Sequence, residues 1–149
     1  MGNKCPICGD ESGLLKAVIL KRLDGKEMCS QCAKKYVEDK IKEIQMTTTN
    51  NFDGYKAKKY IDIASVEIVI GTGIFSEFSG EIADFFGARS TEFEKKLQRA
   101  KKLAFEKLKF IAFEKGGNAV AGIDVDYTEF SGNRIGLIVN GTVLEIEKI

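Results

Sequence analysis

The pattern of apolar and polar residues predicts one helix near the N-terminus, followed by strands that flank a much longer helix. Apolar residues recur every three or four positions at Ala33, Val37, Ile41 and Ile44, which is typical of a helix with one apolar face. Residues 55–70 are rich in β-branched side chains and predict one or two strands. Two more strands are predicted at 119–130 and 135–146, joined by a turn at 131–133.

The long helix is predicted to run from Ser90 or Thr91 to about Lys115. Thr91 and Glu94 fit a capping box at its start, and Gly116-Gly117 fits a left-handed helix end. Its apolar positions cover more than half of the circumference, although a helix on one sheet needs only about a third. We therefore expect either a second copy of the protein or the N-terminal segment to cover the surplus, which includes Leu103, Phe105, Phe110 and Ala112.

The four cysteines are the strongest chemical signal in the chain. They form two Cys-x2-Cys pairs, Cys5 with Cys8 and Cys29 with Cys32, separated by 20 residues. Two such turns supply four thiolates to one tetrahedral zinc ion. Between the pairs, residues 14–23 have strand-forming character and Asp24-Gly25 indicates a turn, so a small ribbon is predicted.

Two other uses of these cysteines are less well supported. A dithiol redox site needs only one Cys-x2-Cys motif. Disulfides need an exported protein, and we expect a cytoplasmic one because no secretion signal is recognisable. With four protein ligands the zinc ion would be structural, and its binding would supply the folding energy of a module this small.

Length and composition agree with two modules. The 149 residues can form a zinc ribbon with its connecting helix at 1–46 and a domain at 47–149, with residues 47–51 as a linker. A net charge of +1 excludes a global attraction to nucleic acid or membranes. The absence of histidine excludes Ser-His-Asp catalysis and histidine-bound catalytic zinc.

Residues 47–149 resemble the YbjQ-like proteins, a group that carries a heavy-metal-binding label. The resemblance is carried by the stretch Asp84-Phe85-Phe86-Gly87-Ala88-Arg89-Ser90, by Gly116-Gly117-Asn118-Ala119-Val120 and by Gly122-Ile123-Asp124-Val125-Asp126-Tyr127. It implies an α+β fold similar to dodecin subunits, with one long helix on an antiparallel sheet and a ring of five chains. It implies no particular activity.

The heavy-metal label fits the second domain poorly, because that domain has neither cysteine nor histidine. Soft metals prefer thiolate or imidazole ligands. Only oxygen ligands such as Asp124, Asp126 and Glu129 remain there, and acids on a strand are more often solvated edge residues. The sequence therefore favours Cys5, Cys8, Cys29 and Cys32 as the metal ligands.

The sequence is compatible with three functions. The favoured one is a non-enzymatic homo-oligomer, a pentamer by the resemblance, that presents the zinc ribbon to a protein partner. Nucleic-acid binding through the ribbon is an alternative, but acids interrupt its basic residues, which are Lys16, Lys21, Arg22, Lys26, Lys34 and Lys35.

The third function is an enzyme or an anion binder at a subunit boundary. The residues for it are Asp84, Arg89, Ser90 and Glu94, because an arginine beside a helix start can hold an anion. A helix cap and an ion pair between subunits explain this cluster more simply. No nucleophile–base pair is recognisable, so no catalytic residue is assigned. The Gly71-Thr72-Gly73 stretch lacks the third glycine of a dinucleotide-binding loop.

Overall fold

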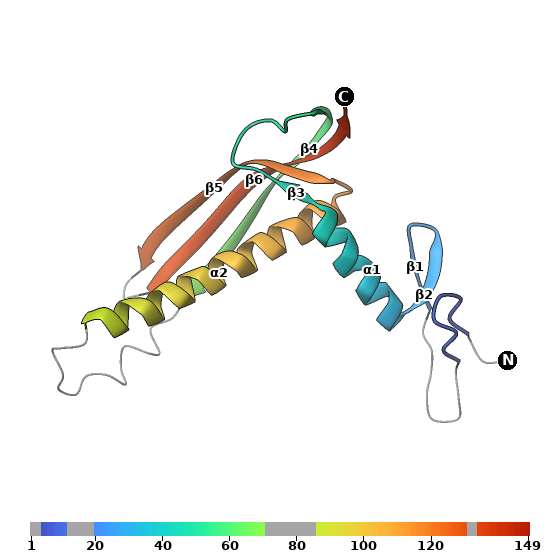
Figure 1. Ribbon diagram of the computed structural model, residues 1–149, viewed down its shortest axis with the longest axis horizontal. Helices are drawn as coiled ribbons and strands as arrows, with labels where there is room; N and C mark the ends of the chain where they lie inside the picture. Colours follow the sequence, from blue (N-terminus) through green and yellow to red (C-terminus); the bar gives the residue numbers. More distant parts are fainter. Residues whose placement is uncertain (1–3, 12–19, 71–85, 131–133) are drawn as a thin grey trace. The chain divides into compact units, whose positions relative to one another are not determined.

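The computed structural model of the protein describes residues 4–11, 20–70, 86–130 and 134–149, and for residues 86–92 only the backbone (Figure 1). The chain divides into two compact units, Met1–Glu43 and Ile44–Ile149. Both combine helix with strands, so the fold is mixed α+β. The division falls three residues before the boundary that the sequence predicts after residue 46.

The first unit is a β-hairpin followed at once by a helix. Strands β1 (Leu20–Leu23) and β2 (Lys26–Cys29) pair antiparallel, and α1 (Ser30–Glu43) starts at the next residue. The predicted turn at Asp24-Gly25 is confirmed, with φ of 48° at Asp24 and 75° at Gly25. Positive φ at both central residues is the geometry of the tightest hairpin turns, which explains the Asp-Gly pair.

The second unit is built on a four-stranded sheet in the order β3-β5-β6-β4. Its strands are β3 (Gln45–Met46), β4 (Tyr55–Ile70), β5 (Ala119–Phe130) and β6 (Arg134–Lys148). The strands predicted at 55–70, 119–130 and 135–146 are confirmed. The expectation of a wholly antiparallel sheet is wrong at one edge, because the two residues of β3 pair parallel with β5.

The segment predicted as a linker is hydrogen-bonded to β5. The Ile123 amide donates to the Thr47 carbonyl at 3.1 Å, and the Gly122 amide donates to the Thr49 carbonyl at 2.9 Å. These bonds lie at an irregularity of β5 between Ala121 and Asp124, where Gly122 has a φ of 60°. Residues 47–51 therefore belong to the second unit.

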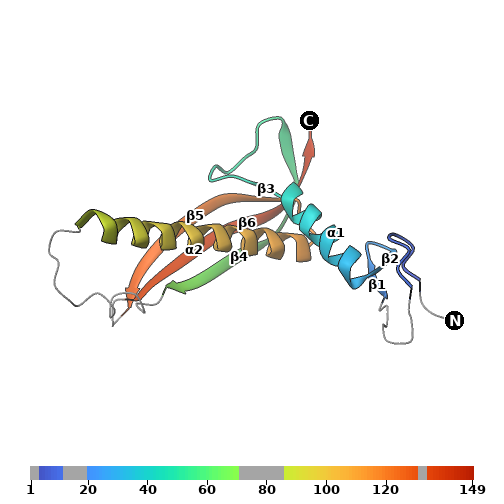
Figure 2. The same cartoon turned by 60° about the horizontal axis from the view of Figure 1, so that its bottom comes forward.

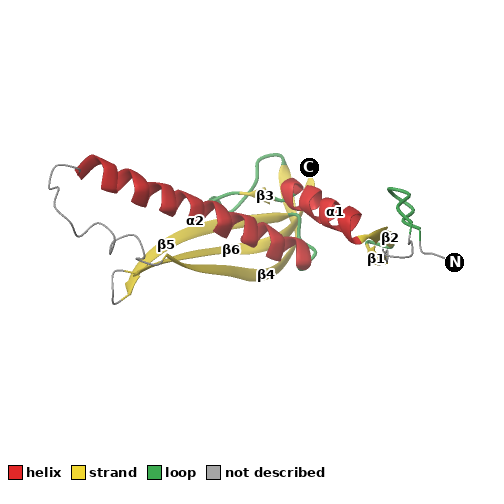
Figure 3. Cartoon of the chain, turned by 90° about the horizontal axis from the view of Figure 1, so that it is seen from below, coloured by secondary structure: helices red, strands yellow, loops and turns green. Residues whose placement is uncertain are grey.

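Helix α2 (Phe86–Glu114) lies along one face of this sheet (Figures 2 and 3). The predicted cap at Ser90 or Thr91 is wrong, because the helix already includes the residues before it. Ala88 and Arg89 are good helix formers, so a capping sequence does not by itself stop the helix from extending.

The other end of α2 is confirmed. Gly116 has a φ of 78°, and the amides of Gly116 and Gly117 donate to the carbonyls of Phe113 and Ala112 at 3.0 and 2.8 Å. This pair of bonds is a Schellman motif.

The core of the second unit lies between α2 and the sheet. The buried helix residues Ala100, Ala104, Leu108 and Ala112 recur every four positions and pack on buried sheet residues, which include Val66, Val120, Leu137, Val139 and Val143. Half of the predicted apolar surplus is exposed in the single chain: Leu103 is 45% exposed and Phe110 is 41% exposed, whereas Ala112 is buried and Phe105 packs against the core. No helix in the described ranges combines the length and the apolar character that a membrane span requires.

Candidate metal centre

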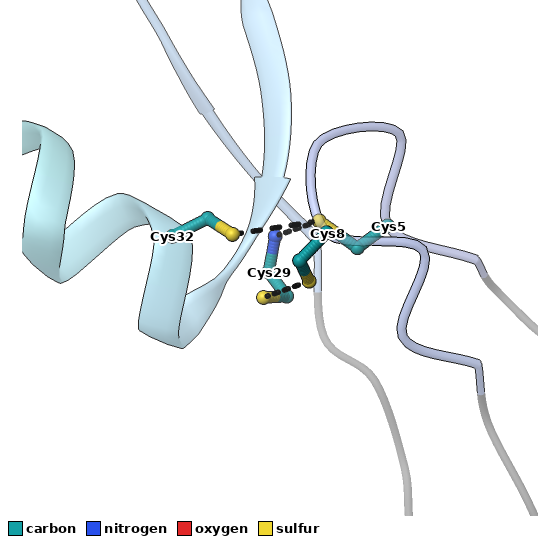
Figure 4. Close-up of side chains that lie close together, drawn as sticks. All are labelled: Cys5, Cys8, Cys29 and Cys32. Atoms are coloured by element: carbon teal, nitrogen blue, oxygen red, sulfur yellow. Dashed lines mark hydrogen bonds between the residues drawn. The ribbon is translucent and has the colours of Figure 1, made fainter.

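The two cysteine pairs converge at one point in the first unit (Figure 4). Their four sulfur atoms all lie within 4.8 Å of one another. Cys8 Sγ is 3.6 Å from Cys29 Sγ, and Cys5 Sγ is 3.9 Å from Cys32 Sγ. A tetrahedron of sulfurs around an ion at about 2.3 Å has edges of about 3.8 Å, so these spacings fit one zinc-sized ion.

A tight turn positions the first pair. The Gly9 amide donates to the Cys5 carbonyl at 2.9 Å, and the Cys5 amide donates to the Asp10 carbonyl at 2.8 Å. Gly9 has a φ of 75°, which a residue without Cβ adopts at low cost. The turn places Cys5 and Cys8 on the same side, as the Cys-x2-Cys-Gly sequence predicts.

The junction between hairpin and helix positions the second pair. Cys29 is the last residue of β2, and Cys32 lies in the first turn of α1. The Cys29 amide donates to Cys5 Sγ at 3.2 Å and so joins the two pairs directly (Figure 4). Amide donors of this kind stabilise a thiolate over a thiol.

The electrostatics of the cluster differ from one cysteine to the next. Hydrogen bonds to Cys5 lower its pKa to about 6, chiefly the one from the Cys8 amide and with help from the Cys29 and Ile7 amides, although burial opposes the shift. The pKa of Cys32 rises to about 12, because Cys8 shares a hydrogen bond with it and burial disfavours its charge. The four sulfurs are therefore not all thiolates at neutral pH unless a cation is bound.

The cluster is also the centre of the small core of its unit. Cys5, Met28, Cys29 and Ala33 are buried, and the side chains of Leu20, Leu23 and Tyr36 pack around them. The Tyr36 hydroxyl donates to a carboxylate oxygen of Asp24 and so ties α1 to the hairpin turn. Sequence reasoning missed Met28 and the Tyr36–Asp24 contact. Two features of the sequence could have pointed to these residues: Met28 directly precedes Cys29, and Tyr36 is one helical turn after Cys32.

The structure does not test the predicted cluster at the start of the long helix. Asp84 lies outside the described residues, and Arg89 and Ser90 lie on α2 where only the backbone is described. Glu94 is exposed on the same helix. The proposed cluster of these four residues thus stays a prediction.

The three acids of β5 are exposed and do not form one group. Asp124 and Asp126 share a sheet face, and Asp124 raises the pKa of Asp126 by like-charge repulsion. Glu129 is an odd number of residues from both and so points to the other face. Across the described parts of the chain, the four cysteines are the only group of three or more side chains placed to share a metal ion.

Comparison with known proteins gives matches to the second unit. The YbjQ family model, described as "Putative heavy-metal-binding", matches residues 44–147. UPF0145 proteins of Bacillus cereus (strain ATCC 10987 / NRS 248) and Bacillus thuringiensis subsp. konkukian (strain 97-27) are both 35% identical to this chain over 101 residues. Each match covers 68% of this chain and 98% of the relative.

A solved structure also aligns with this chain. It is the crystal structure of a protein with unknown function of the DUF74 family from Pediococcus pentosaceus ATCC 25745. It is 19% identical, covers 70% of this chain and 98% of its own, and has a TM-score of 0.40. The family match covers most of the chain and the Bacillus relatives are matched over almost their whole length, so the chain belongs to the YbjQ (UPF0145) family, with a four-cysteine cluster in front of the family's domain.

Proposed function

We propose that this protein is a cytoplasmic homo-oligomer that binds one structural zinc ion per chain through Cys5, Cys8, Cys29 and Cys32. The observation that carries the proposal is the meeting of four sulfurs, from two separate Cys-x2-Cys turns, within 4.8 Å of one another. Four protein ligands complete a tetrahedral shell and leave no position for a substrate or a reactive water. The metal then serves to fold the first unit.

In this chain, the segment that matches the family lacks the side chains that soft heavy metals prefer. All cysteines precede residue 33 and the chain has no histidine, so residues 44–147, which match the family, contain no thiolate or imidazole ligand. Thiolates select zinc and softer ions over magnesium or calcium. The metal site is thus proposed for the segment that the family match does not include.

Cobalt substitution tests the ligand set. Co²⁺ added to the reduced, metal-free protein is expected to give the intense visible and sulfur-to-metal absorption bands of tetrahedral thiolate coordination, saturating at one ion per chain. Zn²⁺ should then abolish these bands, because zinc binds such sites more tightly. Saturation at a different ratio, or a spectrum of six-coordinate Co²⁺, contradicts a four-sulfur site.

The oligomer is proposed from the exposed apolar side chains of α2. Leu103 and Phe110 lie two turns apart on one side of the helix and are 45% and 41% exposed in the single chain. A second copy of the chain is the simplest cover for such a stripe. A ring would also present several zinc modules together, so that weak contacts with one protein partner gain avidity.

Phe110→Glu is expected to weaken the assembly, because it places a charge where an apolar contact is proposed. Size-exclusion chromatography with light scattering measures the mass. Five chains of 16.5 kDa give 5 × 16.5 = 82.5 kDa for the unchanged protein, and a smaller mass is expected for the variant. Gln98→Glu, at an exposed position on another side of the same helix, is the control and should keep the larger mass. Equal masses for all three proteins contradict a role of Phe110 in assembly.

A further inference from the structure

The four sulfurs of the cluster are not equally accessible. Cys8 is exposed, Cys32 is partly buried, and Cys5 and Cys29 are buried. A reagent in solution therefore reaches Cys8 first among these cysteines. Since a metal-bound thiol is deprotonated, the exposed sulfur is held in its nucleophilic form while the metal is bound.

A second sulfur is close enough to complete a disulfide with Cys8. Cys29 Sγ lies 3.6 Å from Cys8 Sγ and comes from a separate segment, the end of β2 (Figure 4). Closing the bond requires the two atoms to approach to about 2.05 Å. An accessible thiolate beside a second thiol is the arrangement of cysteines that oxidants convert reversibly to disulfides.

We propose that Cys8 is an oxidation site for peroxides, and that its oxidation joins it to Cys29 and releases the metal ion. This inference rests on the proposed zinc binding. It assigns the four-cysteine cluster a response to a two-electron oxidant in addition to its structural role.

The chemistry balances in two steps. The Cys8 thiolate attacks hydrogen peroxide, the O–O bond breaks, and Cys8 sulfenic acid and hydroxide form. The Cys29 thiolate then attacks the Cys8 sulfur, the S–S bond forms, and a second hydroxide leaves. In total two thiolates lose two electrons, and one peroxide is reduced to two hydroxide ions.

Formation of the disulfide takes two of the four thiolate ligands from the zinc ion, so the ion is bound much more weakly. The remaining pair, Cys5 and Cys32, supplies two of the four thiolates that a structural zinc site needs. Because Cys5 and Cys29 are also half of the buried core described for the first unit, release of the ion is expected to loosen that unit. A thiol reductant and fresh zinc should restore it.

The test begins with the zinc-loaded, reduced full chain, whose zinc content is measured before any oxidant is added. Hydrogen peroxide is then added with a chromogenic zinc chelator to follow release, and peptide mass spectrometry identifies the disulfide. We expect zinc release to accompany a Cys8–Cys29 disulfide, with both reversed by a thiol reductant.

Two matched variants distinguish the effect of removing the exposed reactive thiol from the effect of replacing any one zinc ligand. Cys8→His keeps a zinc ligand at the exposed position but removes the reactive thiol, and release by peroxide is expected to slow about tenfold or more. Cys32→His makes the same exchange at the less exposed position and keeps Cys8, so peroxide should release its zinc several times faster than that of Cys8→His.

The outcomes distinguish this inference from the function on which it rests. A protein that binds no zinc at the outset overturns the proposed function and the inference together. Zinc that is bound but retained under peroxide, or released while Cys8 stays a free thiol or pairs with a different cysteine, overturns the inference and leaves the structural zinc site intact. Equal sensitivity of both histidine variants also overturns it.

Discussion

Removal of the metal is expected to unfold the first unit and to leave the second unit folded. Among the residues of the first unit that the structure describes, the buried core consists of Cys5, Met28, Cys29 and Ala33, and two of these are proposed ligands. So small a core cannot offset the entropy of ordering the chain. In small zinc modules, metal binding contributes about 10–16 kcal/mol of apparent folding free energy.

Hydrogen exchange with mass spectrometry measures this directly. A strong chelator, or Cys5→Ser in a separate sample, should remove amide protection from β2 and α1 while β5 and β6 keep theirs. Lys4→Ser changes the exposed residue next to Cys5 and serves as the matched control. In this variant the amides of β2 and α1 should keep their protection. Independence of the two units is refuted if β6 loses protection at the same chelator concentration.

Leu108→Ala is expected to destabilise the second unit by about 2–5 kcal/mol, the usual cost of a cavity in a rigid core. Leu108 is fully buried, and it lies among Ala104, Ala112 and the sheet residues of the same core. The small alanines around it let helix and sheet approach closely, so few neighbouring atoms are able to move into the space that the substitution leaves.

Urea unfolding, monitored through a spectroscopic signal of the β-sheet, measures the expected loss of stability in Leu108→Ala. Lys107→Ala is the control: it lies in the same turn of α2 but is exposed, and helix propensity changes little between lysine and alanine. It should change the free energy of unfolding by less than about 0.5 kcal/mol. Similar losses for the two variants contradict the assignment of the Leu108 side of α2 to the core.

That the four cysteines meet could be predicted from the sequence, because each cysteine pair specifies its own turn. Gly9 after Cys8, and the Asp24-Gly25 turn before Cys29, encode local backbone geometry that needs no knowledge of the rest of the fold. What lies around the site was harder to predict. The contact between Tyr36 and Asp24 joins residues 12 positions apart, and no periodic pattern marks such a pair.

In the second unit, long periodic segments were predictable and short pairings were not. The strands and the Gly116-Gly117 helix end follow from residue types alone. Strand β3 has only two residues, too few for an alternation to show, and its partner β5 is some 70 positions away in the sequence. Helix α2 starts earlier than predicted, because a capping sequence is only a local preference and neighbouring helix formers can override it.

Native mass spectrometry of the reduced protein tests the metal centre most directly, since it reports bound zinc and the number of chains in one spectrum. We expect one zinc ion for every chain of the assembly, and loss of that ion when Cys5 and Cys29 are both replaced by serine. A reduced protein that carries no metal while β2 and α1 remain protected from hydrogen exchange would contradict a fold that depends on four sulfurs around one ion.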